Sequence, residues 1–141
     1  MSTTLASSAA APVRLRSDLL TAWFAEVQRR QPLLASVAFV FVLALIPVLI
    51  AQQIDPRLVN GINVWIKPAK FLLSLALYYL TLAWFFGLLS PEARRNRAAR
   101  YVVVAPIVAG VLEIVWLIAA AMHGVPAHFN VGDPVWRTAY Q

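Results

Sequence analysis

Three long apolar runs constrain the fold of this 141-residue chain more than any other feature. They cover residues 32–51, 71–90 and 101–122, and the first two contain no charged residue. A bilayer core of ~30 Å is crossed by ~20 helical residues, and inside it each backbone polar group must bond within its own segment. We therefore predict an all-α integral membrane protein with three transmembrane helices.

The composition points to the same class. Hydrophobic residues make up 61% of the chain and charged residues 13%, with a mean hydropathy of +0.72, which is far from ordinary soluble usage. There is no cysteine, which excludes disulfides, thiolate metal sites and iron–sulfur clusters. The net charge is +6, and the basic residues lie beside the apolar runs. We therefore expect anionic lipid headgroups as partners and no nucleic acid.

The amino-terminal part divides into two segments. Residues 1–16 are rich in Ser, Thr and Ala, and we predict a disordered cytoplasmic tail. Residues 17–30 carry apolar side chains at helical spacing, which predicts an amphipathic helix on the membrane surface. The apolar set is Leu19, Leu20, Trp23, Phe24 and Val27. An alternative is that residues 1–51 are a cleaved secretory signal, although the part before the apolar run is long for one.

The remaining residues, 17–141, are expected to form a single membrane domain. Asp55-Pro56 and Asn60-Gly61 match the start and stop of a helix, which predicts a short interfacial helix between the first two spans. Ser90-Pro91-Glu92 matches a helix start, and we expect the third helix to run on from there through the membrane. Asp133-Pro134 predicts a short interfacial helix in the outer tail, residues 123–141.

Arg and Lys residues are distributed unequally between the two sides of the predicted topology. The amino-terminal segment and the loop between the second and third spans hold eight of them, and the opposite side holds four. Cytoplasmic loops carry the excess of positive residues. We therefore predict a multi-pass membrane protein with its amino terminus in the cytoplasm.

Polar residues inside the apolar runs form the candidate site. Glu113 is the one ionisable residue within them, and its helical neighbours are mostly small, so we expect it to face protein. The second span carries one polar stripe at helical spacing. Its members are Lys67, Lys70, Ser74, Tyr78 and Thr81. Because the depths of Glu113 and Tyr78 are similar, we predict a hydrogen bond between them, direct or through water.

Two interpretations of Glu113 stay open, because it could bind a proton or cation, or it could join two helices as a protonated acid. Lys67 and Lys70 lie in the first turn of a helix, where cations are unfavourable, so an anion is expected nearby. That anion is either a lipid phosphate or an acidic ligand. Residues that could complete such a polar pocket at the outer interface are Asn63, His123, His128 and Asn130.

Metal, cofactor and enzyme chemistry find little support in the sequence. His123 and His128 are separated by a loop that contains Gly124 and Pro126, so they do not form a helical ligand pair. No nucleophile with a positioned base is visible. We therefore predict no metal, no cofactor and no enzymatic activity.

A resemblance supports this choice of residues. The segment Gly61-Ile62-Asn63-Val64-Trp65-Ile66-Lys67-Pro68-Ala69-Lys70-Phe71, the acid Glu113 and His128-Phe129-Asn130 follow one another in the chain. This pattern resembles the front half of a family of uncharacterised bacterial multi-span integral membrane proteins with N-x-W-I-K-P-x-K-F and H-F-N motifs. The resemblance covers about residues 60–131. It implies a bacterial inner membrane as the location and further spans in the longer members. If a site is shared between the two halves, this chain supplies one wall of it.

These features predict a transporter-like or small-anion- or proton-binding membrane module. The alternative is a structural or assembly subunit of a membrane complex, or a truncated half of a larger multi-span protein. Three helices do not easily surround a pathway, so we expect self-association or another membrane subunit, with the small-residue face of the third span as the contact.

Overall fold

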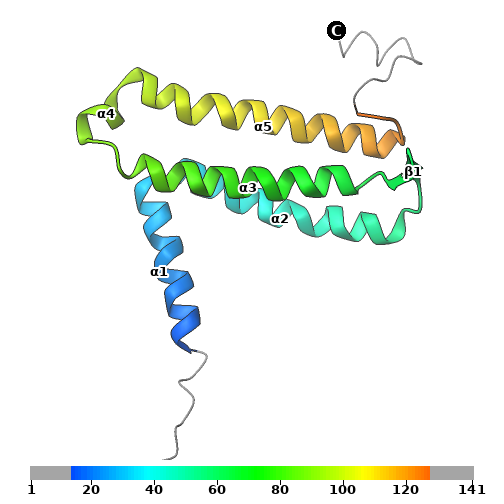
Figure 1. The fold of residues 1–141 in the computed structure, drawn as a ribbon, viewed down its shortest axis with the longest axis horizontal. Helices are drawn as coiled ribbons and strands as arrows, with labels where there is room; N and C mark the ends of the chain where they lie inside the picture. The colour runs from blue at the N-terminus through cyan, green and yellow to red at the C-terminus, as the bar shows by residue number, and fades with distance from the viewer. Residues whose placement is uncertain (1–13, 128–141) are drawn as a thin grey trace, which may run out of the picture.

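The three apolar runs form three long helices that lie side by side. The computed structural model describes residues 14–127. Helices α2 (Pro32–Ile54), α3 (Ile66–Phe86) and α5 (Arg97–His123) lie along the long axis, and α3 runs antiparallel to the other two (Figure 1). At 1.5 Å per residue they are about 32 to 40 Å long. Each is long and apolar enough to cross a membrane, which confirms the predicted all-α class and the three candidate spans.

The second span is displaced from its predicted range. Helix α3 begins at Ile66 and ends at Phe86, whereas residues 71–90 were expected. Pro68 fits inside the first turn because the first amides of a helix have no intrahelical acceptor. At the other end, Gly87 and Leu88 donate their amides to Trp84 and Phe85 carbonyls, which closes the helix in a tight turn.

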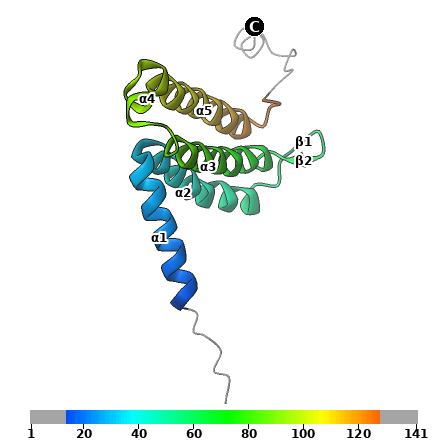
Figure 2. The ribbon, with the colours of Figure 1, turned by 60° about the vertical axis from the view of Figure 1, so that its left-hand side comes forward.

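The amino-terminal helix α1 (Arg14–Arg30) leaves the bundle crosswise, as two views show (Figures 1 and 2). It begins three residues before the predicted start at Ser17. Only Gln31 separates it from α2, and the Gln31 side chain accepts a hydrogen bond from the Leu33 amide. The rest of the predicted tail lies outside the described residues, as does the predicted carboxy-terminal interfacial helix.

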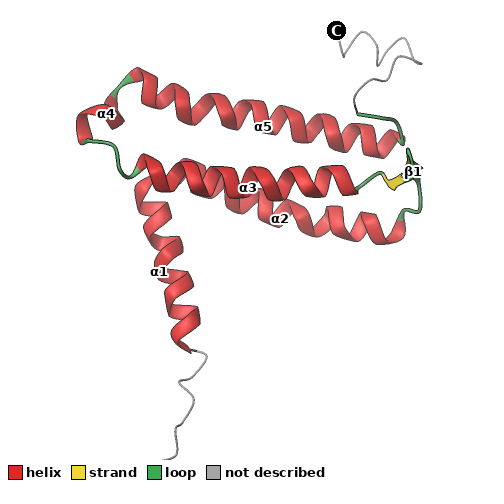
Figure 3. Cartoon of the chain, in the orientation of Figure 1, coloured by secondary structure: helices red, strands yellow, loops and turns green. Residues whose placement is uncertain are grey.

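A small β-hairpin replaces the predicted interfacial helix between the first two spans, and that prediction was wrong. Strand β1 (Leu58–Val59) pairs antiparallel with β2 (Ile62–Asn63), shown in yellow in Figure 3. Between them Asn60 and Gly61 have φ values of 53° and 78°. Two successive positive φ angles define the hairpin turn that Asn-Gly favours most. The dipeptide therefore starts a reversal instead of ending a helix.

The start of the third helix is divided in two. The Ser90 hydroxyl accepts from the Ala93 amide at 3.2 Å, as its capping position predicts. The helix that follows, α4 (Pro91–Arg95), stops after five residues. Asn96 is extended, and its side chain accepts from the Ala98 amide at 3.2 Å, so it caps α5 as a new helix. The expectation of one continuous helix from Ser90 was wrong because Asn96 offers its own cap.

Tyr79 connects all three long helices. It is fully buried in α3, and its ring meets Phe41 of α2 edge-on, with 5.6 Å between the centroids. Its hydroxyl donates to the Pro106 carbonyl of α5 at 2.8 Å. Gly110 lies directly against that hydroxyl, where a Cβ would overlap it. The centre of the bundle is therefore a single phenol that contacts both neighbouring helices.

Candidate functional site

A pocket of about 320 Å³ lies at the hairpin end of the bundle. The hairpin and the start of α3 form one wall, and the last turns of α5 with the residues after it form the other. Most of the described lining residues are apolar. Three are polar or charged, namely Asn60, Asn63 and Lys67.

Lys67 supplies the positive charge of this pocket. It is half-buried in the first turn of α3, where the backbone dipole already carries partial positive charge. Its ammonium lies 6.0 Å from the centroid of the Phe71 ring. The described lining residues include no carboxylate. The anion expected beside Lys67 stays a prediction, and the lining of the pocket is compatible with it.

Asn63 lines the pocket, but its amide is used by the fold. Its Nδ2 donates to the Asp55 carbonyl at 2.6 Å and to the Gln52 carbonyl at 3.4 Å. Its Oδ1 accepts from the Trp65 amide at 2.9 Å. The amide nitrogen thus holds the hairpin against the end of α2, and the amide oxygen holds it against the start of α3. Asn63 shapes the wall from which Lys67 projects.

An ion pair that we call the clasp, Asp55 and Arg57, ties the hairpin to α5. Arg57 Nη2 lies 2.7 Å from Asp55 Oδ2, and the Trp65 indole donates to the same oxygen at 2.8 Å. The Arg57 guanidinium also donates to the carbonyls of Met122 at 3.0 Å and Ala121 at 3.3 Å. These carbonyls belong to the last turn of α5, where a cation is favourable.

Sequence reasoning missed the clasp, since it treated Arg57 only as a charge for topology. The contact spans more than 60 residues of chain, so no local pattern reports it. The available signal was Asp55-x-Arg57 before an Asn-Gly turn, where a short acid–base pair can stabilise a loop. Because Ala121 also lines the pocket, the clasp fixes the distance between its two walls.

The clasp should survive mild acid. Hydrogen bonds from Arg57, and then from the Trp65 indole, hold the pKa of Asp55 well below its ordinary value of 3.8. A lowered folded-state pKa gives a contribution that is complete above about pH 4 and is lost only as the pH falls through the lower folded value. We expect the indole N–H resonance of Trp65, assigned with Trp65→Phe, to stay constant from neutral pH to about pH 4. Asp55→Asn should shift it at every pH, and a midpoint near 4 in the unmodified protein would contradict the bond.

Most of the predicted polar stripe of α3 lies on the exposed side of the helix. Its members do share one face, but the buried residues Leu72, Ala76 and Tyr79 lie on the opposite face. Tyr78 is 48% exposed, and the Thr81 hydroxyl donates to the Leu77 carbonyl of its own helix at 2.8 Å. Lys70 and Ser74 are exposed as well. Lys67 alone among the stripe residues reaches the pocket.

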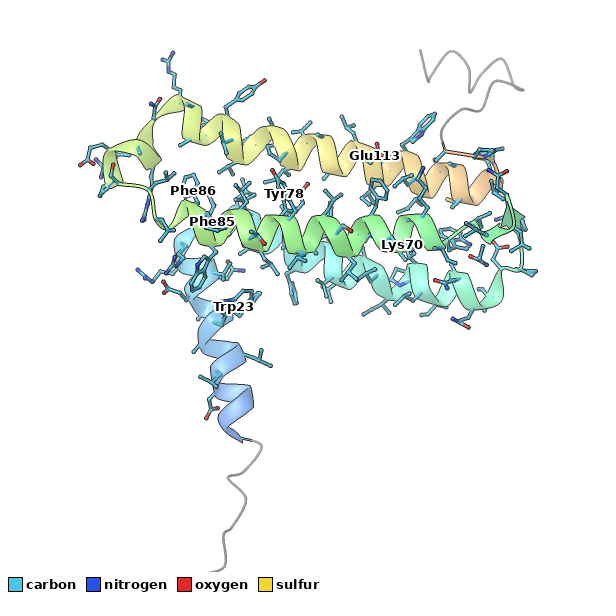
Figure 4. All side chains as sticks on the ribbon, viewed as in Figure 1. Trp23, Lys70, Tyr78, Phe85, Phe86 and Glu113 are labelled. Atoms are coloured by element: carbon cyan, nitrogen blue, oxygen red, sulfur yellow. The ribbon has the colours of Figure 1, made fainter. Side chains whose placement is uncertain are left out.

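Glu113 is half-buried on α5, where Figure 4 labels it. It lines a shallow groove on α5 with Ala109, Leu112 and Trp116. Its small neighbour Gly110 is buried against α3, so the face predicted for self-association is partly used within the chain.

Tyr79, the residue after the predicted Tyr78, donates a hydrogen bond from its phenol to α5. Tyr79 reaches Pro106 and Gly110, which precede Glu113 along α5. Sequence reasoning treated Tyr79 as a packing residue, although a lone glycine in the middle of an apolar span was a signal for close contact. The hydrogen bond between Glu113 and Tyr78 stays a prediction.

His128 and Asn130 lie outside the described residues. The chain that leads to them folds back toward α5, because the Trp116 indole donates to the Ala127 carbonyl at 2.7 Å. His123 is exposed at the end of α5. Of the residues proposed for the pocket, the described part of the chain therefore brings together Lys67 and Asn63.

The fold defines a class: a helical protein with three helices long and apolar enough to cross a membrane. Comparisons with models of protein families, with curated proteins and with solved structures give no match for this chain. The resemblance carried by the N-x-W-I-K-P-x-K-F segment therefore stays an expectation.

Proposed function

We propose that this protein is a small-anion-binding module of the membrane and that its site is the pocket at the hairpin end. One observation carries the proposal. A pocket of about 320 Å³ holds the ammonium of Lys67 at a helix start, with no carboxylate among the described residues that line it. An anion placed there would gain both the lysine charge and the dipole of α3.

The lining indicates the chemistry of the anion. Apolar side chains from α5 and from the residues after it, such as Leu117 and Val125, line the pocket with Lys67. A site of about 300 Å³ is large enough for a small molecule. The pocket therefore suits a phosphate or carboxylate group attached to an apolar body. A lipid headgroup and a free organic anion share this chemistry.

The distribution of Arg and Lys residues supports a location of the site on the outer side of the membrane. With the amino terminus in the cytoplasm of a bacterial cell, the hairpin end faces the outer side of the inner membrane. Lys67 then lies near the outer headgroup layer. A reporter fused to the amino terminus tests this placement, because a cytoplasmic reporter should be active there and an exported one inactive.

A matched pair of variants tests the site. We expect Lys67→Gln to weaken anion binding roughly tenfold or more, because a charged hydrogen bond contributes about 1.5 to 3 kcal/mol. Lys70→Gln is the control, since Lys70 is exposed one turn away and outside the pocket. Native mass spectrometry in a neutral detergent measures phosphatidylglycerol binding, and calorimetry with hexanoate and inorganic phosphate measures free anions.

The lipid measurement and the free-anion measurement together identify the source of the anion. Loss of phosphatidylglycerol binding in Lys67→Gln alone would assign a lipid headgroup, and loss of hexanoate or phosphate binding alone would assign a free anion. Equal losses in Lys67→Gln and Lys70→Gln would show only general attraction of lysines to headgroups, and the proposed site would be wrong.

An assembly role is the second candidate, and the exposed face of α3 favours it. Ser74 and Tyr78 are exposed polar residues in the middle of a span, where a helix from another subunit would satisfy them. The further spans implied by the family resemblance would cover the same face. We expect Tyr78→Leu to lower the oligomer mass measured by light scattering in detergent. Glu113→Gln tests the separate hypothesis that Glu113 binds a proton. This hypothesis fails if the substitution leaves both assembly and transport unchanged.

A further inference from the structure

Helix α1 carries an apolar stripe that continues beyond its contact with the bundle. The inner part packs on the spans: Val27 is fully buried, and the Phe24 ring lies 6.0 Å from the ring of Phe39. The outer part is exposed, with Leu20 at 70% and Trp23 at 42%. At 100° per residue, these four α1 residues fall on one side of the helix.

The contact with Phe39 gives the direction of this stripe. Phe39 lies seven residues inside α2, which is about 10 Å along the span from its first residue. Because Phe24 reaches Phe39, the apolar side of α1 points along the spans toward their middle. Figure 4 shows Trp23 on the side of α1 toward which the bundle extends.

The junction holds α1 in this crosswise position. The Arg30 guanidinium lies 4.0 Å from the centroid of the Trp84 ring, and its Nη1 donates to the Trp84 carbonyl at 3.1 Å. Its Nε lies 2.7 Å from Glu26 Oε1. A Cβ on Gly87 would lie 2.6 Å from Arg30 Cδ, so the glycine is needed for this approach. The last turn of α1 is thus attached to the end of α3.

We infer that α1 is a membrane-surface anchor whose apolar stripe inserts into the lipid that surrounds the spans. The occupant is the acyl–headgroup boundary of the bilayer that α2, α3 and α5 cross. The outer stripe continues the surface that packs on α2, and the exposed sides of α2 are themselves apolar. On the opposite side, Ala25 and Arg29 are exposed, with the Arg29 side chain at 75%. Such a helix lies in the interface plane with its apolar side buried about 5 to 10 Å.

The absence of cysteine from the sequence makes a depth measurement direct. Single nitroxide labels are placed at Leu20→Cys and Trp23→Cys, with Ala25→Cys as the matched control on the opposite side. The full chain is reconstituted in nanodiscs of phosphatidylethanolamine and phosphatidylglycerol. Collision of each label with oxygen, which concentrates in lipid, and with a water-soluble nickel chelate gives its depth.

We expect the oxygen-to-nickel collision ratio at positions 20 and 23 to exceed the ratio at position 25 several-fold. Equal access of the nickel chelate to all three positions would place α1 in water and overturn the inference. Exclusion of both reagents from positions 20 and 23 would show that protein covers the stripe, which also overturns it. Leu20→Cys retains Trp23, so it reports depth with that part of the stripe intact.

Discussion

Replacing Gly110 with alanine is expected to destabilise the bundle by about 1 to 3 kcal/mol, the usual cost of inserting a methyl group into a well-packed site. The new Cβ would overlap the Tyr79 hydroxyl, which donates to Pro106. The phenol cannot withdraw easily because its ring lies 5.6 Å from Phe41 in α2. A reversible unfolding titration with dodecyl sulfate measures the change in the free energy of unfolding.

Tyr79→Phe provides the control for this clash. On its own it removes one hydrogen bond, and such bonds between membrane helices contribute about 0.6 kcal/mol on average. It also removes the atom that the new methyl group would meet. Gly110→Ala should therefore cost much less in the Tyr79→Phe background than in the unmodified protein. A full loss of stability in both backgrounds would show that Tyr79 does not determine the approach of α3 and α5.

The spans were predictable from sequence because the bilayer imposes a length and an apolar composition on any helix that crosses it. The orientation of each helix about its own axis was not predictable in the same way. Apolar residues lie on all sides of α3, so its hydropathy does not distinguish Tyr78 from Tyr79. The informative residues are the small ones, Ala76, Ala83 and Gly110, which lie where helices approach closely.

The hairpin and the clasp show a second limit of prediction from the sequence. Asn60-Gly61 is compatible with both a helix end and a β-turn, and the flanking residues decide between them. Val59 and Ile62 are β-branched and pair across the turn, which favours the hairpin. The contact of Arg57 with the end of α5 depends on how the three helices assemble. The sequence therefore indicated Lys67 as a pocket residue, but it did not indicate which residues at the end of α5 form the opposite wall of the pocket.

Replacing Arg30 with methionine is expected to release α1 from the bundle. Methionine keeps much of the aliphatic volume against Gly87 and Trp84, but it removes the hydrogen bond to the Trp84 carbonyl and the cation over the indole ring. A charged hydrogen bond contributes about 1.5 to 3 kcal/mol, and a desolvated cation–π contact adds about 1 to 2 kcal/mol. Since Val27 and Phe24 provide the rest of the contact, α1 should sample a wider range of angles.

Spin labels at Leu20→Cys and Leu88→Cys, both exposed positions, measure this angle as a distance distribution. With Arg30 present we expect one narrow distribution, and with Arg30→Met a broad one. Arg29→Met is the matched control: Arg29 also bonds to Glu26 at 2.9 Å, but its side chain is 75% exposed, so the distribution should stay narrow. If Arg30→Met leaves it narrow, packing of Phe24 and Val27 alone fixes α1. If Arg29→Met broadens it equally, the shared Glu26 holds the junction, because both arginines lower its pKa to about 2 through their hydrogen bonds.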